Sequence, residues 1–222
     1  CSNSPYFAKT WVGRTQNCIP CLVGRNYFSN FWSMVRSKLE ELYKEIDKYI
    51  GIPYYMNVTK KYLPEIALVG KGNAKEIALK TIELANTDNK KIINMTPTQI
   101  YNFQKKHKIG IDCSGLTVQL LNFYLKTNFN PRKTSADILT SAPLSKKINI
   151  KDAQTADLIR QEKGGHVIFI IEKVENKIYY VESSRAGRKV HYGQFDINDK
   201  NFKYDGIYRI TSPQSIPGIL MV

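Results

Sequence analysis

Cys113 stands in the stretch Gly-Ile-Asp-Cys-Ser-Gly, between a carboxylate and two small residues. The apolar run Leu-Thr-Val-Gln-Leu-Leu follows, which predicts a buried helix beginning at or near Cys113. Asp112 is placed as its N-cap, and Gly115 adds no side chain near the N-terminus of the helix. A helix N-terminus stabilises the thiolate, which is the nucleophilic form of cysteine. The pattern therefore predicts a reactive thiol, with a structural cysteine in a tight corner as the alternative.

A nucleophilic cysteine is usually paired with a histidine, and the sequence has three histidines. His166 follows two glycines and opens the most apolar strand-like stretch, where its ring can lie beside a helix N-terminus. His107 lies in a lysine-rich polar segment and His191 in an edge-like strand, and we interpret both as solvated surface residues. His166 is the predicted base, and a hydrogen-bonded residue at the start of a strand is the structural alternative.

The elements that must position these residues are helices first and strands afterwards. An amphipathic helix is predicted from a cap at Ser29 to a stop at Gly51 and Pro53. Two further helix starts, at Asn73 and Thr96, have capping-box spacing. A loop is predicted after the cysteine helix, and the rest of the chain is β-branched and aromatic. The strands are predicted at 156–159, 166–174, 177–184, 188–195 and 205–210. This order predicts an α+β domain with a meandering antiparallel sheet.

Length and charge limit the function classes. The 222 residues suffice for one domain with a substantial core, and no apolar run is long enough to span a bilayer. The net charge of +14 favours an anionic partner such as nucleic acid, a lipid surface or a cell-wall polymer. The basic residues are spread throughout the chain without a nucleic-acid-binding motif, so we expect no specific nucleic-acid partner.

The remaining cysteines lie near the amino terminus, at Cys1, Cys18 and Cys21. A chain opening with Cys-Ser suits a bacterial lipoprotein with an acylated first cysteine, although a trimmed sequence explains this start more simply. A disulfide, a partial metal site and unremarkable thiols all remain open for the three, and we favour unremarkable thiols. We expect no metal and no cofactor.

Six sequence blocks, taken together, resemble the NlpC-type cysteine peptidases, papain-like enzymes that cut peptidoglycan stem peptides. The blocks occur in the family's order over more than half of the chain. They are GIPY at 51–54, DCSG at 112–115, PRKTSAD at 131–137, TADLI at 155–159, GGHVIFI at 164–170 and YYVESS at 179–184. The resemblance implies a papain-like fold in which the nucleophile helix packs on an antiparallel sheet.

The resemblance also implies roles for six residues. Cys113 matches the nucleophile, His166 the base, and Glu182 the polar residue that orients the base. Tyr54, Asp112 and Ser114 match positions that line the substrate groove and support the nucleophile. The alternation of residues in a strand places Glu182 on one face with Ile178 and Tyr180, whereas Ser183 faces away. The other reading of Glu182 is a solvated carboxylate paired with Arg185.

Three features depart from the family pattern. More than fifty residues separate GIPY from DCSG, where the family has a short link, and this stretch holds ten lysines against four acidic residues between 57 and 109. The orienting residue is a glutamate in place of His, Asn or Gln, and TADLI lacks the usual Pro-Gly.

We divide the chain into an irregular extension, residues 1–28, and a catalytic domain, residues 29–222, with a helical insertion at 57–109 near the groove.

The leading hypothesis is a peptidoglycan endopeptidase that is secreted or associated with the cell envelope, with an anchor through Cys1 in the lipoprotein reading. Its implied partners are a stem peptide and an anionic cell-wall polymer. The alternative is a thiol amidase, acyltransferase or effector-like enzyme of the same fold with another substrate. The third hypothesis is a non-enzymatic basic binding module, which would not need Cys113 beside His166.

Overall fold

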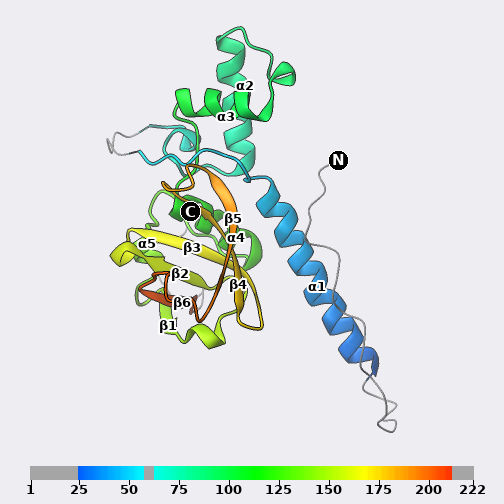
Figure 1. The fold of residues 1–222 in the computed structure, drawn as a ribbon. Helices are drawn as coiled ribbons and strands as arrows, with labels where there is room; N and C mark the ends of the chain where they lie inside the picture. Colours follow the sequence, from blue (N-terminus) through cyan, green and yellow to red (C-terminus); the bar gives the residue numbers. More distant parts are fainter. Residues whose placement is uncertain (1–24, 58–62, 212–222) are drawn as a thin grey trace. The chain divides into compact units, whose positions relative to one another are not determined.

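The computed structural model describes residues 25–57 and 63–211, with side chains from residue 36 onward. The chain divides into two compact units, residues 1–37 and residues 38–222. The described part of the first unit is the beginning of helix α1 (Arg25–Asp47). The course of the chain is drawn in Figure 1, and the features below belong to the second unit. The expectations for Cys1, Cys18 and Cys21 fall outside the described residues.

The second unit is built on a six-stranded antiparallel sheet with the order β1-β6-β2-β3-β4-β5. The strands are β1 (Ser145–Ile148), β2 (Leu158–Gln161), β3 (His166–Val174), β4 (Lys177–Ser183), β5 (Val190–Asp196) and β6 (Gly206–Ile210). Strands β2 to β5 pair in chain order, and β6 returns to lie between β1 and β2. The predicted α+β class with a largely meandering sheet is confirmed.

Alternating side chains of the strands form a core on each face of the sheet. Val167, Phe169 and Ile171 of β3 belong to the larger core with the helices α4 (Cys113–Tyr124) and α5 (Ala136–Leu139). Ile168 and Ile170 belong to the smaller core on the opposite face. Helix α4 contacts β3 and β4, so the predicted nucleophile helix packs against the middle of the sheet.

Two helices, α2 (Ala74–Thr87) and α3 (Pro97–Lys106), lie outside the sheet. Both begin with the capping boxes predicted at Asn73 and Thr96, and a buried side-chain hydrogen bond joins them. Figure 1 shows this helical hairpin beyond one end of the sheet. As predicted for residues 57–109, the described part of this segment adds no strand to the sheet.

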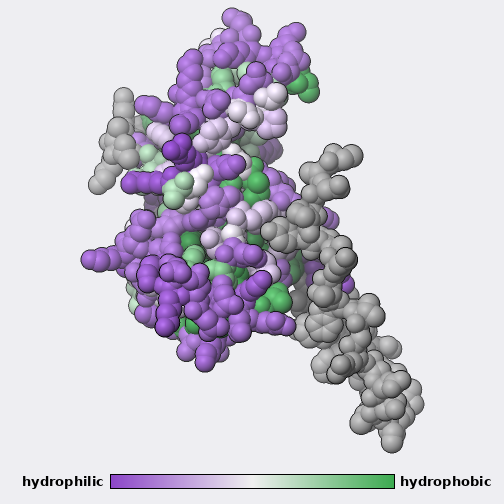
Figure 2. All heavy atoms as spheres, viewed as in Figure 1, coloured by the Kyte–Doolittle hydropathy of each residue, from purple (hydrophilic) through white to green (hydrophobic). Residues whose placement is uncertain are grey.

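The surface of the α2–α3 hairpin is mainly hydrophilic in the view of Figure 2, in keeping with its lysine-rich sequence. Leu79, Ile82 and Ile93 are exposed hydrophobic exceptions. Within residues 25–57 and 63–211, no helix has the length and apolar character needed to cross a membrane.

Three elements differ from the sequence-based expectation. Helix α1 begins at Arg25, before the predicted cap at Ser29, because serine inside a helix costs only a few tenths of a kcal/mol. The polar strand β1 is an edge strand defined by its pairing with β6, and sequence patterning alone does not reveal it. The one-turn helix α5 interrupts the predicted loop, and Ser135 caps it.

Candidate active site

Cys113 is the first residue of α4, and its side chain is buried. Asp112 caps the helix as predicted, since its carboxylate accepts the Gly115 N–H at 2.6 Å. The first backbone N–H groups of a helix have no partner within it and, with the helix dipole, favour a negative charge at this end. In the described residues Cys113 forms no disulfide. Its sulfur therefore belongs to the end of α4 that favours a negative charge.

Gly115 allows the segment before α2 to approach the start of the nucleophile helix. A Cβ atom at this position would lie 2.4 Å from the carbonyl oxygen of Gly70, which a side chain cannot tolerate. The same carbonyl accepts the Asp112 N–H at 2.9 Å, and Gln119 donates to the Lys71 carbonyl at 3.0 Å. Part of the 57–109 segment therefore contacts the beginning of α4.

Lys71 contacts two of the predicted groove residues, Asp112 and Ser114. Its ammonium lies 2.9 Å from Asp112 Oδ1 and also donates to Ser114 Oγ. The Lys71 and Asp112 side chains are only 15% and 7% exposed. Both predicted groove residues are thus held by a cation from the 57–109 segment. Sequence reasoning missed Lys71 because it is one of ten lysines between 57 and 109, and no motif relates it to Cys113.

Replacing Lys71 with methionine is expected to lower the free energy of unfolding by about 3 kcal/mol, because it leaves the buried Asp112 carboxylate unpaired. Urea unfolding at pH 7 measures the change. Lys75, an exposed lysine at the start of α2, provides the control, and its methionine variant is expected to change stability by less than about 0.5 kcal/mol. Equal effects of the two substitutions would contradict the prediction.

His166 and Glu182 lie at the same end of the sheet because β3 begins where its antiparallel neighbour β4 ends. Continuing the β3–β4 register places them as diagonal neighbours on one face. His166 Nε2 lies 2.7 Å from Glu182 Oε2, and the two side chains are 9% and 13% exposed. This leaves Nδ1 of the ring available to Cys113, whose interaction with His166 raises the pKa of the ring. The structure thus brings the three predicted catalytic residues together.

Glu182 lies on the face of β4 that strand alternation predicts, together with Ile178 and Tyr180. Ile178 and Tyr180 pack in the smaller core on the same face, and Ser183 points the other way, donating to the Ile111 carbonyl at 2.7 Å. Glu182 is therefore held against His166, and the alternative of a solvated carboxylate paired with Arg185 does not describe the structure.

The protonation of His166 depends on opposing influences. Burial lowers its pKa, but the hydrogen bonds and negative charges of Cys113 and Glu182 outweigh burial and raise the pKa to about 9. The ring is consequently an imidazolium at neutral pH. An imidazolium beside a thiol at a helix N-terminus favours the thiolate–imidazolium pair.

This raised pKa predicts a pH dependence of stability. Because the folded chain holds the His166 proton more tightly than the unfolded chain, its contribution is complete below about pH 6.5 and is lost as pH rises through about 9. The free energy of unfolding is therefore expected to fall from pH 7 to pH 9.5, as measured by urea denaturation. A His166→Gln variant is expected to lack this component, and identical profiles for the two proteins would refute the assignment.

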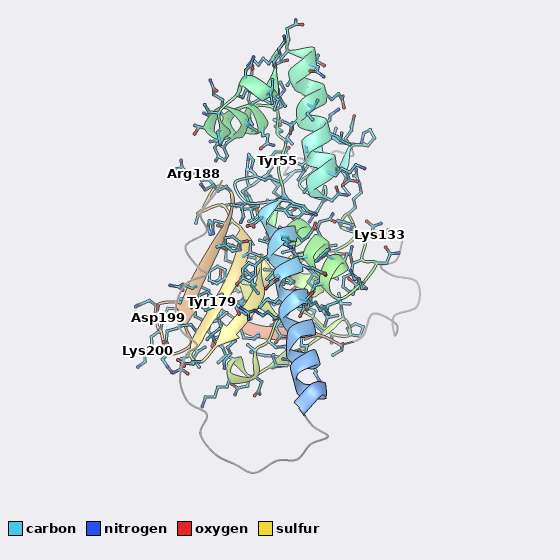
Figure 3. All side chains as sticks on the ribbon, turned by 90° about the vertical axis from the view of Figure 1, so that its right-hand side faces the viewer. Tyr55, Lys133, Tyr179, Arg188, Asp199 and Lys200 are labelled. Carbon is cyan, nitrogen blue, oxygen red and sulfur yellow. The ribbon has the colours of Figure 1, made fainter. Side chains whose placement is uncertain are left out.

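Tyr54, which the resemblance assigns to the substrate groove, lies near enough to Cys113 to feel its charge. Burial, followed by the negative charge of Cys113, raises the pKa of the Tyr54 hydroxyl, and a hydrogen bond from Arg185 partly offsets this. The Tyr54 N–H donates to the Arg188 carbonyl at 2.9 Å. Figure 3 shows Arg188 and the neighbouring Tyr55 at the end of the sheet next to α3, away from Asp199 and Lys200 at the other end.

His191, interpreted from the sequence as a solvated surface residue, is partly exposed but also contacts the candidate site. Strand β5 is an edge strand as predicted, but His191 lies directly opposite Glu182, and its Nε2 is 3.5 Å from Glu182 Oε1. The contact results from the pairing of β4 with β5. In the sequence, the only sign of it is that these two strands follow each other with a short turn between them. His107 is partly exposed and pairs with Asp88 at 3.1 Å, away from the site.

In the part of the chain that the structure describes, no three or more His, Cys, Asp or Glu side chains form a cluster suited to a metal ion. A buried cysteine at a helix N-terminus, a histidine and an orienting carboxylate on an α+β fold resemble the sites of thiol hydrolases.

Neither a family profile nor a curated protein sequence matches this chain. Among solved structures, it is similar to that of the peptidoglycan hydrolase RipB from Mycobacterium tuberculosis, with 18% identity and a TM-score of 0.41. The similarity covers 80% of this chain and 66% of that structure, so the chain spans just under two thirds of its length.

Proposed function

We propose that this protein is a cysteine peptidase that hydrolyses an amide bond in peptidoglycan stem peptides through a thioester intermediate. The contact of His166 with both Cys113 and Glu182 is the observation that supports it most. A buried carboxylate on the far nitrogen of a histidine, with a thiol at the near nitrogen, suits nucleophilic catalysis and has no evident structural purpose.

In this proposal the Cys113 thiolate attacks the amide carbonyl and forms a carbon–sulfur bond. The backbone N–H of Cys113 stabilises the negative oxygen of the tetrahedral intermediate. The carbon–nitrogen bond then breaks as His166 gives its proton to the leaving amine. Neutral His166 next takes a proton from water, whose oxygen attacks the thioester carbon, and the acid product leaves as the thiolate–imidazolium pair is restored. Glu182 holds the ring and stabilises its positive charge.

The substrate class rests on the six motif blocks and on charge. A net charge of +14 favours association with an anionic polymer such as the cell wall. A peptidoglycan substrate also places the protein outside the cytoplasmic membrane, secreted or attached to the envelope.

Incubation with purified sacculi, followed by mass spectrometry of the released peptides, tests this function. The wild-type protein is expected to release fragments with a new amine and a new carboxylate at one amide bond, and Cys113→Ala is expected to release none. Sacculi that remain intact while Cys113 still forms thioesters with other acyl compounds would contradict the substrate class alone.

The environment of Asp112 favours a second candidate, a thiol amidase or acyltransferase acting on another substrate. Lys71 neutralises Asp112 and donates to Ser114, so both residues that the resemblance assigns to the substrate groove are already engaged by a cation. Adding a primary amine to the sacculus reaction separates the two. An acyltransferase attaches the amine to the acyl product, whereas a peptidase releases the free acid.

A further inference from the structure

Two histidines share the Glu182 carboxylate, one on each oxygen. His166 Nε2 lies 2.7 Å from Oε2, and His191 Nε2 lies 3.5 Å from Oε1. Glu182 is directly opposite His191 in the β4–β5 register and diagonal to His166 on the other side. The Glu182 side chain is only 13% exposed, and both rings lie within ion-pair distance of it. Rotation of the carboxylate would break both contacts at once.

The His191 ring is held in place by the turn between β4 and β5. A Cβ atom at Gly187 would lie 2.1 Å from His191 Nε2, so the backbone of this turn lies directly against the ring. The turn is closed by the Gly187 N–H, which donates to Ser184 Oγ at 3.0 Å. The ring therefore has little freedom to leave Glu182.

The surroundings also select which nitrogen of His191 carries the proton. Nδ1 is buried and has no hydrogen-bond partner among the described residues. A proton on Nδ1 would leave a buried N–H unsatisfied, whereas a proton on Nε2 points toward the Glu182 carboxylate. Glu182 is the charged side chain within ion-pair distance of the ring, and the cationic residues of the adjoining turn, Arg185, Arg188 and Lys189, are exposed.

We propose that His191 is a positioning residue, whose Nε2–H holds Glu182 so that the other carboxylate oxygen stays directed at His166. The inference rests on the proposed function, because it extends the Cys113–His166–Glu182 arrangement by a fourth member. In this arrangement His191 acts on His166 only through Glu182.

The test is the titration of His166, followed by NMR of 15N-labelled histidine side chains in the full chain. His191→Leu removes the donor, and the pKa of His166, about 9 in the wild type, is expected to fall by about one unit because Glu182 is no longer held against it. His191→Gln retains an N–H donor at the position of Nε2 and is expected to restore most of the shift. If the leucine variant does not fold, His191→Met supplies a second side chain without a donor.

The matched control is His107, which also pairs through Nε2 with a carboxylate but lies in the α2–α3 hairpin region. His107→Leu is expected to leave the His166 titration unchanged. The inference is overturned if His191→Leu or His191→Met titrates as the wild type does, or if Gln lowers the pKa as much as Leu. A rise also overturns it, since His191 would then compete with His166 for the carboxylate. The titration needs no substrate, so it remains decisive even where stem peptides are not cleaved.

Discussion

Replacing Cys113 with alanine is expected to abolish amide hydrolysis, with a loss of at least about 10³-fold in kcat. The reason is chemical, because no other described cysteine is available to form the thioester. The variant is also expected to fold, since a small residue fits the start of α4 and Asp112 still caps the helix. Release of peptides from sacculi measures the loss, and thermal unfolding verifies the fold.

The same thiol is expected to react first with iodoacetamide at pH 7, because the helix N-terminus and the His166 imidazolium both favour its thiolate. Peptide mapping after partial labelling should find Cys113 modified in step with the loss of activity. A His166→Gln variant should slow this labelling while leaving the thiol in place. Full hydrolytic activity in Cys113→Ala would end the enzyme hypothesis.

Replacing Glu182 with glutamine is expected to lower kcat by about 10²-fold, and replacement with alanine by more. Glutamine keeps the size of the side chain but removes the charge 2.7 Å from His166, so the imidazolium is less stable. Since His166 must carry a proton to release the amine, the basic limb of the pH–activity profile is expected to move to lower pH. Alanine leaves the ring without a partner on Nε2 and should also impair its orientation.

Glu175 provides a control for this substitution, because it is an exposed carboxylate in the turn between β3 and β4. Glu175→Gln changes the net charge by the same amount and is expected to leave both kcat and the pH profile as they are. Glu182 would be excluded as the orienting residue if both its variants retained wild-type turnover while His166→Ala was inactive.

Local sequence determined the elements that carry the site. The N-cap at Asp112, the start of α4 at Cys113 and the strand from His166 to Val174 were all predicted, and the structure confirms them. Capping, helical periodicity and β-branched composition are short-range effects, so they can be read from neighbouring residues. The face of Glu182 followed from strand alternation for the same reason.

Only the tertiary structure decided which of these residues meet. Lys71 reaches Asp112 across 41 positions of sequence, and nothing in its neighbours distinguishes it from the other lysines between residues 57 and 109. His191 joins Glu182 because the β4–β5 register places them opposite one another, and a shift of one residue would turn the ring to the other face. Strand β1 likewise exists through its pairing with β6. The sequence determined the chemistry available at each position, whereas packing and register determined the partners, because these depend on residues distant along the chain.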